Sequence, residues 1–501
     1  MRPQYLVQSY YGARITWRLA CCFGAFFSSL LGRAIVVFEG SPERGRGQMV
    51  TGTGLQNTGS GVDARPTISS VIEQLKLTRI HVNIIIAAAL GFAFDSYDTY
   101  IVSYGMPSII REWKIDAITI GVLTSAGFWG MLIGAIVWGP ITDRFGRKVG
   151  FIGTILGFAS LTGLTVFATN VYQFAVLRLV TGMCLGGMIP VDTTLVSEFI
   201  ATRYRGRFVA TLTVLWPLGM FTAAIGALLL VPHYGWRVLF ILGVIPAFLS
   251  FWVRWGMPES PRWLAARGRM TEAVAVLKRL GASDAAVQEI KPDEIADKVP
   301  FRTLLQSPYL KRFILTFGYY FFGYFGYYGF LLWLPSILVT VYHLTLVKTF
   351  TFTLFAGLAS IAGRSTAFYT VEKFGRKQLF YVGFGLGGVV ALLFGRIHDP
   401  TILVCGVCVL NWLIEQGAAG TVIWTPELYP SKIRATATCW STAGGRIAPA
   451  ISPVVFGWFF QRQMYYGVYI TMAVFFWITV ALVFFLGIET KGKSLHEIGA
   501  A

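Results

Sequence analysis

The sequence predicts an all-α integral membrane protein with twelve transmembrane helices in two pseudo-symmetric bundles of six. Composition is the first support, because 55% of the 501 residues are hydrophobic and 13% are charged, whereas soluble proteins carry about 25% charged residues. The second support is a set of twelve apolar runs of the roughly 20 residues that a spanning helix needs. The third is an internal repeat that relates the first six runs to the last six.

All of the apolar runs have the length of a helix, which excludes a β-barrel made of strands of about 10 residues. Residues 76–256 form the predicted N-terminal bundle, and residues 312–490 form the predicted C-terminal bundle. The predicted spans are 82–108, 119–142, 149–169, 171–197, 207–231, 235–256, 312–340, 347–371, 378–396, 400–424, 435–460 and 464–488.

The two bundles align with each other at a shift of 229 residues. Each matching landmark opens or closes a long apolar run, so the repeat follows the predicted helices. Tandem copies of a membrane module are typical of transporters with two halves. The matching positions are 143–148 with 372–377, Glu198 with Glu427, Arg205 with Arg434 and, one residue off this shift, Glu259 with Glu489.

The basic residues lie in alternate loops between the predicted spans. Arg144, Arg147 and Lys148 share one loop, whereas Asn170 and His233 lie in loops poor in Lys and Arg. This distribution follows the positive-inside rule and places both termini in the cytoplasm. The net charge of +18 is therefore explained by membrane topology, and nucleic acid is not a predicted partner.

Three segments lie outside the repeat. We interpret residues 1–75 as a disordered tail or an over-extended translation start, with Met49 as a candidate true start and a targeting segment as the alternative. Residues 257–311 are expected to form short amphipathic helices on the cytoplasmic face, because apolar residues recur there at helical spacing. Residues 491–501 form a predicted cytoplasmic tail.

The repeated loop motif predicts a conformational latch in each half. Gly139 is expected to allow close packing of helices, and Gly146 to supply the positive φ of a tight turn. Asp143 is expected to accept hydrogen bonds from a neighbouring helix start or to pair with an arginine. Asp192 is interpreted as a gate or a cap. The predicted latch and gate residues are Gly139, Asp143, Arg144, Gly146, Arg147, Asp192, Glu198, Arg205, Glu372, Arg376, Glu427 and Arg434.

Two acidic residues lie near the middle of the first predicted span. Asp95 and Asp98 are three residues apart and share one helix face, and an ionised side chain at mid-bilayer costs about 2.5–3.5 kcal/mol. Burial and mutual repulsion favour a proton on at least one of them. We predict that the pair couples transport to protons or binds substrate, with Asp98 as the deeper acid. The alternative is that one of them pairs with Arg178 for structure.

The other charged residues within spans have open interpretations. Arg178 either balances the two acids, holds a substrate carboxylate by two parallel bonds, or forms a structural ion pair. Glu415 faces no cation that the sequence reveals, and it is either a residue of the transport cavity, with a role in proton coupling or substrate binding, or a structural residue. Arg446 is either a gate, an anion ligand or a structural residue. Arg364 is expected to reach the cytoplasmic face by snorkelling.

The seventh predicted span is crowded with aromatic residues and glycines. Glycines at 318, 323, 326 and 329 are expected to interrupt the helix, and glycine-broken spans indicate a central site. Tyrosines take the places that Asp95 and Asp98 hold in the first half. We expect a flat substrate ring to stack on Tyr327 or Tyr328 while its carboxylate meets an arginine.

Several segments match short motifs of nucleotide-binding, redox or metal-binding proteins, but their surroundings in the sequence do not fit those functions. Residues 487–494 satisfy the P-loop pattern, but a membrane span precedes them where a nucleotide site needs a strand. Cys405 and Cys408 form a lone CxxC inside a span, and the five histidines are scattered. The sequence therefore predicts no enzyme, no cofactor and no metal.

As a set, the motifs resemble those of the major facilitator superfamily, and within it the branch of sugar porters and metabolite:proton symporters. The residues that carry this resemblance are the loop motif at 139–148, Arg178-x3-Gly182-x3-Gly186, and Pro258-Glu259-Ser260-Pro261-Arg262. The acid pair of the first span is similar to that of aromatic-acid and nicotinate-type carriers. The resemblance covers about residues 75–497.

This resemblance implies a secondary active transporter that works as a monomer in the plasma membrane by alternating access. The implied substrate is a small organic metabolite, an organic or aromatic carboxylate, moved together with protons. A sugar facilitator, a drug exporter and a membrane sensor without transport are the alternatives. The solute, the direction and the proton stoichiometry stay open.

Overall fold

The structure, a computed structural model, describes residues 65–288, 290–293, 299–397 and 399–491. The expected tail up to residue 64, with Met49, lies outside the described residues, as do residues 492–501. The described chain is almost entirely helical, and its isolated β-bridge joins Thr67 to Lys291. The prediction of an all-α protein is confirmed.

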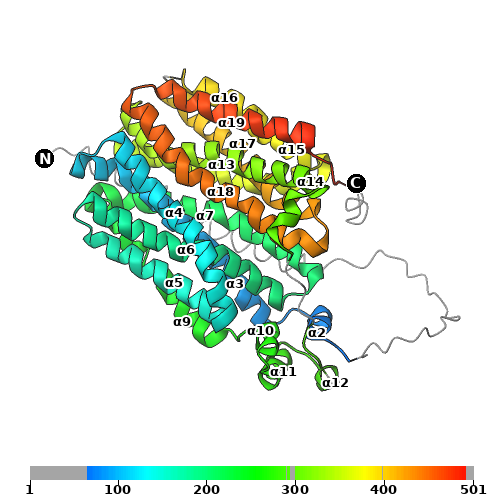
Figure 1. Ribbon diagram of the computed structural model, residues 1–501. Helices are drawn as coiled ribbons and strands as arrows, with labels where there is room; N and C mark the ends of the chain where they lie inside the picture. Colours follow the sequence, from blue (N-terminus) through cyan, green and yellow to red (C-terminus); the bar gives the residue numbers. More distant parts are fainter. Residues whose placement is uncertain (1–64, 289, 294–298, 398, 492–501) are drawn as a thin grey trace. The chain divides into compact units, whose positions relative to one another are not determined.

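Two consecutive sets of long helices make up most of the described chain (Figure 1). The first set is α3 (Arg79–Trp113), α4 (Ala117–Phe145), α5 (Arg147–Leu164) with η1 (Thr165–Phe167), α6 (Val171–Phe199), α7 (Thr202–Tyr234), α8 (Arg237–Leu242) and α9 (Pro246–Gly256). The second set is α13 (Tyr309–Thr340), α14 (Leu346–Phe374), α15 (Arg376–Phe380), η3 (Tyr381–Leu386), α16 (Gly387–Phe394), α17 (Pro400–Trp424), η4 (Thr425–Leu428), α18 (Ser431–Gln461) and α19 (Tyr465–Leu486).

Among the described residues, 10 helices are long and apolar enough to cross a membrane. They coincide with ten of the twelve predicted spans. The predicted span 235–256 is split into α8 and α9 at the turn before Pro246, and the predicted span 435–460 is the single helix α18. Helix α18 carries Arg446 and a run of small polar residues, which lowers its apolar character.

Helices α4 and α6 pack at backbone distance. A Cβ atom added to Gly182 would clash with the carbonyl oxygen of Gly127, and one added to Gly186 would clash with that of Met131. This confirms that the glycines of the Arg178 motif form a packing face. The expectation for Gly139 is wrong, because this residue is exposed and no atom of another described helix lies within 4 Å of its Cβ position.

The seventh span is not interrupted by its glycines. Helix α13 runs unbroken through all four of them and through Pro335. Added Cβ atoms at Gly323, Gly326 and Gly329 would lie 2.9, 2.6 and 2.7 Å from phenylalanine rings of three other helices. These glycines therefore make room for aromatic packing, and the expectation of a broken helix is wrong.

The segment between the halves folds as expected into short helices, which are α10 (Pro261–Ala266), α11 (Met270–Arg279), α12 (Asp284–Val287) and η2 (Phe301–Leu305). The apolar residues Ala273, Val276 and Leu277 of α11 are buried. We call the side of the bundles where this segment lies the central-segment side. The opposite side is the one where residues 114–116 join α3 to α4.

The last part of the expected tail is ordered, which corrects the boundary at residue 75. Helix α2 (Ile68–Gln74) buries Ile68, Val71 and Ile72 in the same apolar core as α10 and α11. The carboxylate of Glu73 accepts hydrogen bonds from the amide of Thr202 at 3.0 and 2.9 Å, at the start of α7. The helix is therefore anchored to the N-terminal half.

The two halves meet through α3 with α13, α4 with α18 and α7 with α14. On the opposite side this contact is close enough to involve the backbone. An added Cβ at Gly121 of α4 would lie 2.5 Å from the carbonyl oxygen of Pro453 of α18, and one at Gly457 would lie 2.5 Å from that of Ala117. The halves are thus closed against each other on the opposite side.

Candidate functional site

Asp98 and Arg178 form a buried ion pair inside the N-terminal half. Oδ2 of Asp98 lies 3.1 Å from Nη1 of Arg178, and the hydroxyl of Thr162 donates to Oδ1. Nη2 of Arg178 donates to the hydroxyls of Thr162, Thr165 and Thr181 at 3.2, 3.0 and 3.2 Å. The geometry is that of the structural pairing that the sequence left open for one of the two acids.

A small cavity borders this ion pair between α3, α4 and α6. Its volume is about 20 Å³, and Asp98, Thr124 and Arg178 are among its lining residues. A space of this size holds about one water molecule. The Asp98 carboxylate is therefore enclosed by protein with room for a single water beside it.

Asp95 is in a different situation, one helical turn away. Its side chain is 1% exposed, and its Oδ1 has no hydrogen-bond partner in the part of the chain that the structure describes. The positive charge with which it interacts is Arg446 on α18, in the other half. The guanidinium of Arg446 interacts in turn with Asp95 and with Tyr328. A carboxylate of one half thus interacts electrostatically with an arginine of the other half, and the two do not form a direct ion pair.

Aromatic rings stand around these two charges. The ring of Tyr328 on α13 meets the edge of Phe128 on α4 at a centroid distance of 5.3 Å, and Tyr324 lies 5.7 Å from Tyr328. Gly445 lets the ring of Tyr324 pack against α18, since a Cβ atom added to this glycine would lie 2.8 Å from Cδ2 of Tyr324. Asp95, Phe128, Tyr328 and Arg446 are the four residues that we call the central site, and they come from both halves.

A second buried ion pair lies inside the C-terminal half. Oε2 of Glu415 on α17 lies 2.6 Å from Nη2 of Arg364 on α14, and the hydroxyl of Tyr327 donates to Oε1 at 2.7 Å. Glu415 and Arg364 are 0% and 5% exposed. The expectation that Arg364 snorkels is wrong, and Glu415 does have a cation. Of the two tyrosines expected to stack on a substrate ring, Tyr327 therefore donates to Glu415, and Tyr328 belongs to the central site.

Asp192 does not act as a cap. It lies on α6, 0% exposed, and neither of its carboxylate oxygens has a hydrogen-bond partner among the described residues. The cap interpretation is therefore wrong, because a capping carboxylate accepts hydrogen bonds from backbone amides. The charged group with which it interacts is Asp95.

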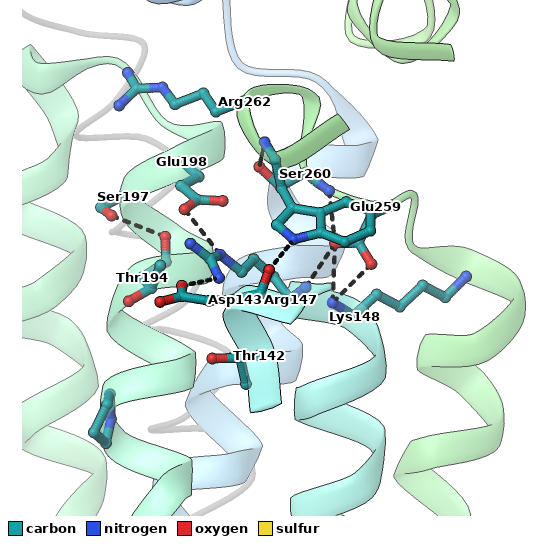
Figure 2. Close-up of polar contacts among 12 residues, drawn as sticks. Thr142, Asp143, Arg147, Lys148, Thr194, Ser197, Glu198, Glu259, Ser260 and Arg262 are labelled. Atoms are coloured by element: carbon teal, nitrogen blue, oxygen red, sulfur yellow. Dashed lines mark hydrogen bonds and ion pairs between the residues drawn. The ribbon is translucent and has the colours of Figure 1, made fainter. Parts of the chain in front are cut away.

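The repeated loop motif forms a polar cluster at the central-segment side of the N-terminal half. Figure 2 shows Arg147 between Asp143 and Glu198, at 2.6 and 3.1 Å. Gly146 has a φ of +108°, which confirms its expected role in the turn. Glu259 accepts hydrogen bonds from the amides of Arg147 and Lys148, at 2.9 and 3.1 Å. Asp143 is expected from the sequence either to accept hydrogen bonds from a helix start or to pair with an arginine, and the structure shows the pairing with arginine. Glu259 is the residue that accepts hydrogen bonds from the helix start.

The C-terminal half repeats this arrangement. Arg376 forms two hydrogen bonds with Glu427, at 2.8 and 2.7 Å, and Gly375 has a φ of +98°. Glu489 accepts from the amides of Arg376 and Lys377, both at 3.1 Å. The internal repeat of the sequence is thus a repeat of polar geometry.

The remaining predicted latch residues make weaker connections. Arg144 is exposed and stacks on Phe145, and Glu372 is exposed and interacts with Arg376. Nε of Arg434 donates to the carbonyl oxygen of Tyr429 at 3.2 Å, so it holds the end of η4. The side chain of Arg205 lies outside the described residues.

Sequence reasoning missed the role of Glu259 and Glu489. Both were landmarks of the repeat, but each follows the last span of its half by sequence and lies far from the loop motif. The signal was their matching position after equivalent spans, together with glycine-led helix starts that need an acceptor.

Replacing Glu489 with glutamine is expected to lower stability at neutral pH by about 1–2 kcal/mol. Burial raises the pKa of Glu489, but hydrogen bonds from the amides of Arg376, Lys377, Lys491 and Thr490 outweigh it and hold the pKa below its usual value. The native contribution is therefore present above the unfolded pKa of about 4.3 and is lost as pH falls through the lower native pKa.

The measurement is thermal unfolding of both proteins in detergent from pH 7 down to pH 3.5. The two melting temperatures should converge at the acid end. A constant difference across this range would contradict the assignment of the stabilisation to the carboxylate. Glu372→Gln, an exposed acid on the neighbouring helix end, is the matched control.

Three comparisons with known proteins agree with one another. A family model described as sugar (and other) transporter matches residues 82–501. A niacin transporter of Acinetobacter baylyi is 32% identical over 436 residues, covering 86% of this chain and 99% of the relative. A gallate transporter of Pseudomonas putida is 28% identical, covering 79% of this chain and 89% of the relative. The inward-open xylose transporter of E. coli shares the fold, with a TM-score of 0.67 at 19% identity over 83% of this chain and 99% of that one.

Proposed function

The chain belongs to the sugar (and other) transporter family of the major facilitator superfamily and is a multi-pass membrane transporter of small metabolites, and we propose that it moves an aromatic or related organic carboxylate together with protons. The relatives that carry niacin and gallate support this substrate class, since both names denote a carboxylate on an aromatic ring. The central site supplies the matching chemistry.

One observation carries the proposal, namely that Asp95 of one half interacts electrostatically with Arg446 of the other half while its Oδ1 has no hydrogen-bond partner among the described residues. When Asp95 is ionised, its negative charge attracts Arg446 and balances the positive charge of that arginine. A proton on Asp95 removes this attraction and frees Arg446 for another anion. Guanidinium binds carboxylates by two parallel hydrogen bonds. Substrate carboxylate and proton therefore load together.

The aromatic residues of the central site fit the rest of the substrate. Tyr328 and Phe128 come from opposite halves and meet edge to face, so a flat ring that displaces this contact when the halves move apart would touch both halves at once. Stacking of this kind contributes about 0.5–1.5 kcal/mol beyond the buried area. A site with aromatic residues and an arginine favours a substrate that has both a flat ring and a carboxylate. An aromatic acid has both of these groups, whereas a sugar has neither.

Transport follows from rocking of the halves around this site. The halves are closed on the opposite side, and in the proposed cycle rocking breaks this closure while the central-segment side closes. The protein lies in the plasma membrane in this proposal. The central-segment side and both termini are in the cytoplasm, because the loops on that side carry the basic residues. The polar clusters around Arg147 and Arg376 tie helices together within each half, so that each half moves as one body. The protein acts as a monomer surrounded by lipid.

The test is uptake into proteoliposomes that hold purified protein and an imposed pH difference. Radiolabelled nicotinate and gallate should accumulate when the outside is more acidic, and a protonophore should abolish accumulation. Xylose is the matched neutral solute and should stay at background. Accumulation of xylose in place of the acids would overturn the carboxylate assignment, and binding of either acid without flux would indicate a sensor.

A further inference from the structure

Asp192 on α6 is an acid that the transport cycle above does not use. It is completely buried, and within the described part of the chain both of its carboxylate oxygens lack hydrogen-bond partners. An ionised carboxylate in such a place has neither the donors nor the cation that offset lost hydration. The group is therefore not a structural anchor of the kind that Asp98 and Glu415 form with their arginines.

Gly91 shows where the Asp192 carboxylate lies along α3. A Cβ atom at Gly91 would lie 3.0 Å from Oδ2 of Asp192, so the carboxylate covers the face of α3 at this residue. Asp95 is four residues further on and occupies the same face. Because four residues of helix rise about 6 Å, Asp192 lies one turn nearer to the central-segment side than Asp95 does.

Asp95 is the titratable group with which Asp192 can exchange a proton. Among the described residues, Asp95 on α3 is the charged group that interacts with Asp192, and Arg446 on α18 interacts with Asp95. On its own helix the next acid is Glu198, six residues or about 9 Å away. Glu198 and the charged ends of α4 and α5 are engaged with one another through Arg147.

We propose that Asp192 is a proton relay between Asp95 and the central-segment side. This inference rests on the proposed function, in which Asp95 carries the proton. The proton leaves an oxygen of Asp95 and binds the Asp192 carboxylate, so one O–H bond breaks and one forms. It then passes from Asp192 to water that enters along α6 when the central-segment side is open. Asp95 is left ionised before Arg446.

A relay changes the rate of proton release but not the number of protons carried. The steady accumulation ratio depends only on the coupling stoichiometry, so it stays the same without the relay. Exchange of labelled for unlabelled substrate needs no proton release, because the loaded carrier returns with its proton bound. Net uptake, in contrast, waits for Asp95 to lose its proton in every cycle.

The experiment compares Asp192→Asn with the wild type in proteoliposomes, using nicotinate as the substrate and a pH difference as the driving force. Three quantities are measured, namely exchange rate, net uptake rate and final accumulation ratio. We expect exchange within twofold of the wild type, net uptake slowed at least about tenfold, and the same final ratio. Thr193→Val, at the next position on α6, is the control and should behave as the wild type.

The ratio of net uptake to exchange is compared within each variant, so that it does not depend on how much protein folds. If Asp192→Asn fails to fold, Asp192→Glu takes its place and should keep that ratio near the wild-type value, whereas Asp192→Ser should lower it. An unchanged ratio of net uptake to exchange in Asp192→Asn, or in Asp192→Ser, overturns the relay. A changed accumulation ratio also overturns it, because Asp192 would then carry a proton across. Uptake that needs Na⁺ in place of the pH difference would assign the two acids to a cation.

The relay and the proposed function fail in different ways. Accumulation by Asp95→Asn at the wild-type ratio would remove the proton from Asp95 and overturn both. Loss of accumulation in Asp95→Asn together with unchanged net uptake in Asp192→Asn overturns the relay alone.

Discussion

Asp95→Asn is expected to abolish proton-driven accumulation while substrate exchange continues. Asparagine keeps the size of the side chain but cannot bind or release a proton, so the site stays in the form that leaves Arg446 free for the substrate. For one proton carried with one monovalent carboxylate, no net charge moves, and a pH difference of one unit supports about tenfold accumulation. The final ratio for the variant should fall to about one.

The measurement is the ratio of internal to external nicotinate at steady state, with exchange measured in the same vesicles. Asp116→Asn is the control, because Asp116 is an exposed cap at the start of α4 and lies outside the site. Retained accumulation in Asp95→Asn, with loss in Asp98→Asn, would move the proton to the pair with Arg178. A second proton in each cycle would add about 2.3 kcal/mol per 100 mV of membrane potential.

Breaking the Arg364–Glu415 pair is expected to have the largest effect on stability. Removing one partner leaves the other charge buried without compensation, which costs about 3–5 kcal/mol. Glu415→Leu should therefore unfold at a much lower temperature than the wild type. The double variant with Arg364→Met and Glu415→Leu should recover most of this loss, since neither charge remains in the bundle.

The measurement is a double-mutant cycle, in which thermal unfolding of the wild type, the two single variants and the double variant is compared in detergent. A double variant that loses the sum of both single effects would show that the two side chains do not depend on each other. Arg396→Met provides a matched removal of an arginine at an exposed position. Because Tyr327 donates to Glu415, the single variants should also alter substrate affinity if this tyrosine orients its neighbour Tyr328.

The fold was predictable because its signals are local or periodic. Apolar runs of helical length, basic loops and the repeat of residues 143–148 at 372–377 each depend on nearby residues. The amphipathic stripe of α11 and the glycine face of α6 were predictable for the same reason. The helix that Ile68–Gln74 forms was not, because its stability comes from apolar contacts with a segment about 200 residues later in the chain.

The pairing of the buried charges could not be predicted. Asp98 finds Arg178 and Glu415 finds Arg364 across helices, and nothing in the spacing of these residues selects one partner over another. The sequence therefore left Asp95 and Asp98 as equals, whereas the structure separates them by their neighbours. Gly139 and the glycines of α13 show the same limit, because a glycine in a span does not reveal which side chain or backbone approaches it.

The closure between α4 and α18 has a consequence for how the transporter responds to ionic strength. At Gly121 and Gly457 the halves touch through main-chain atoms, so no charge has to be separated when this seal opens. The arginine clusters at the other end depend on partly exposed ions, whose attraction weakens as the Debye length falls to about 3 Å in 1 M salt. Concentrated salt should therefore weaken the arginine clusters on the central-segment side and leave the main-chain contact between α4 and α18 unchanged.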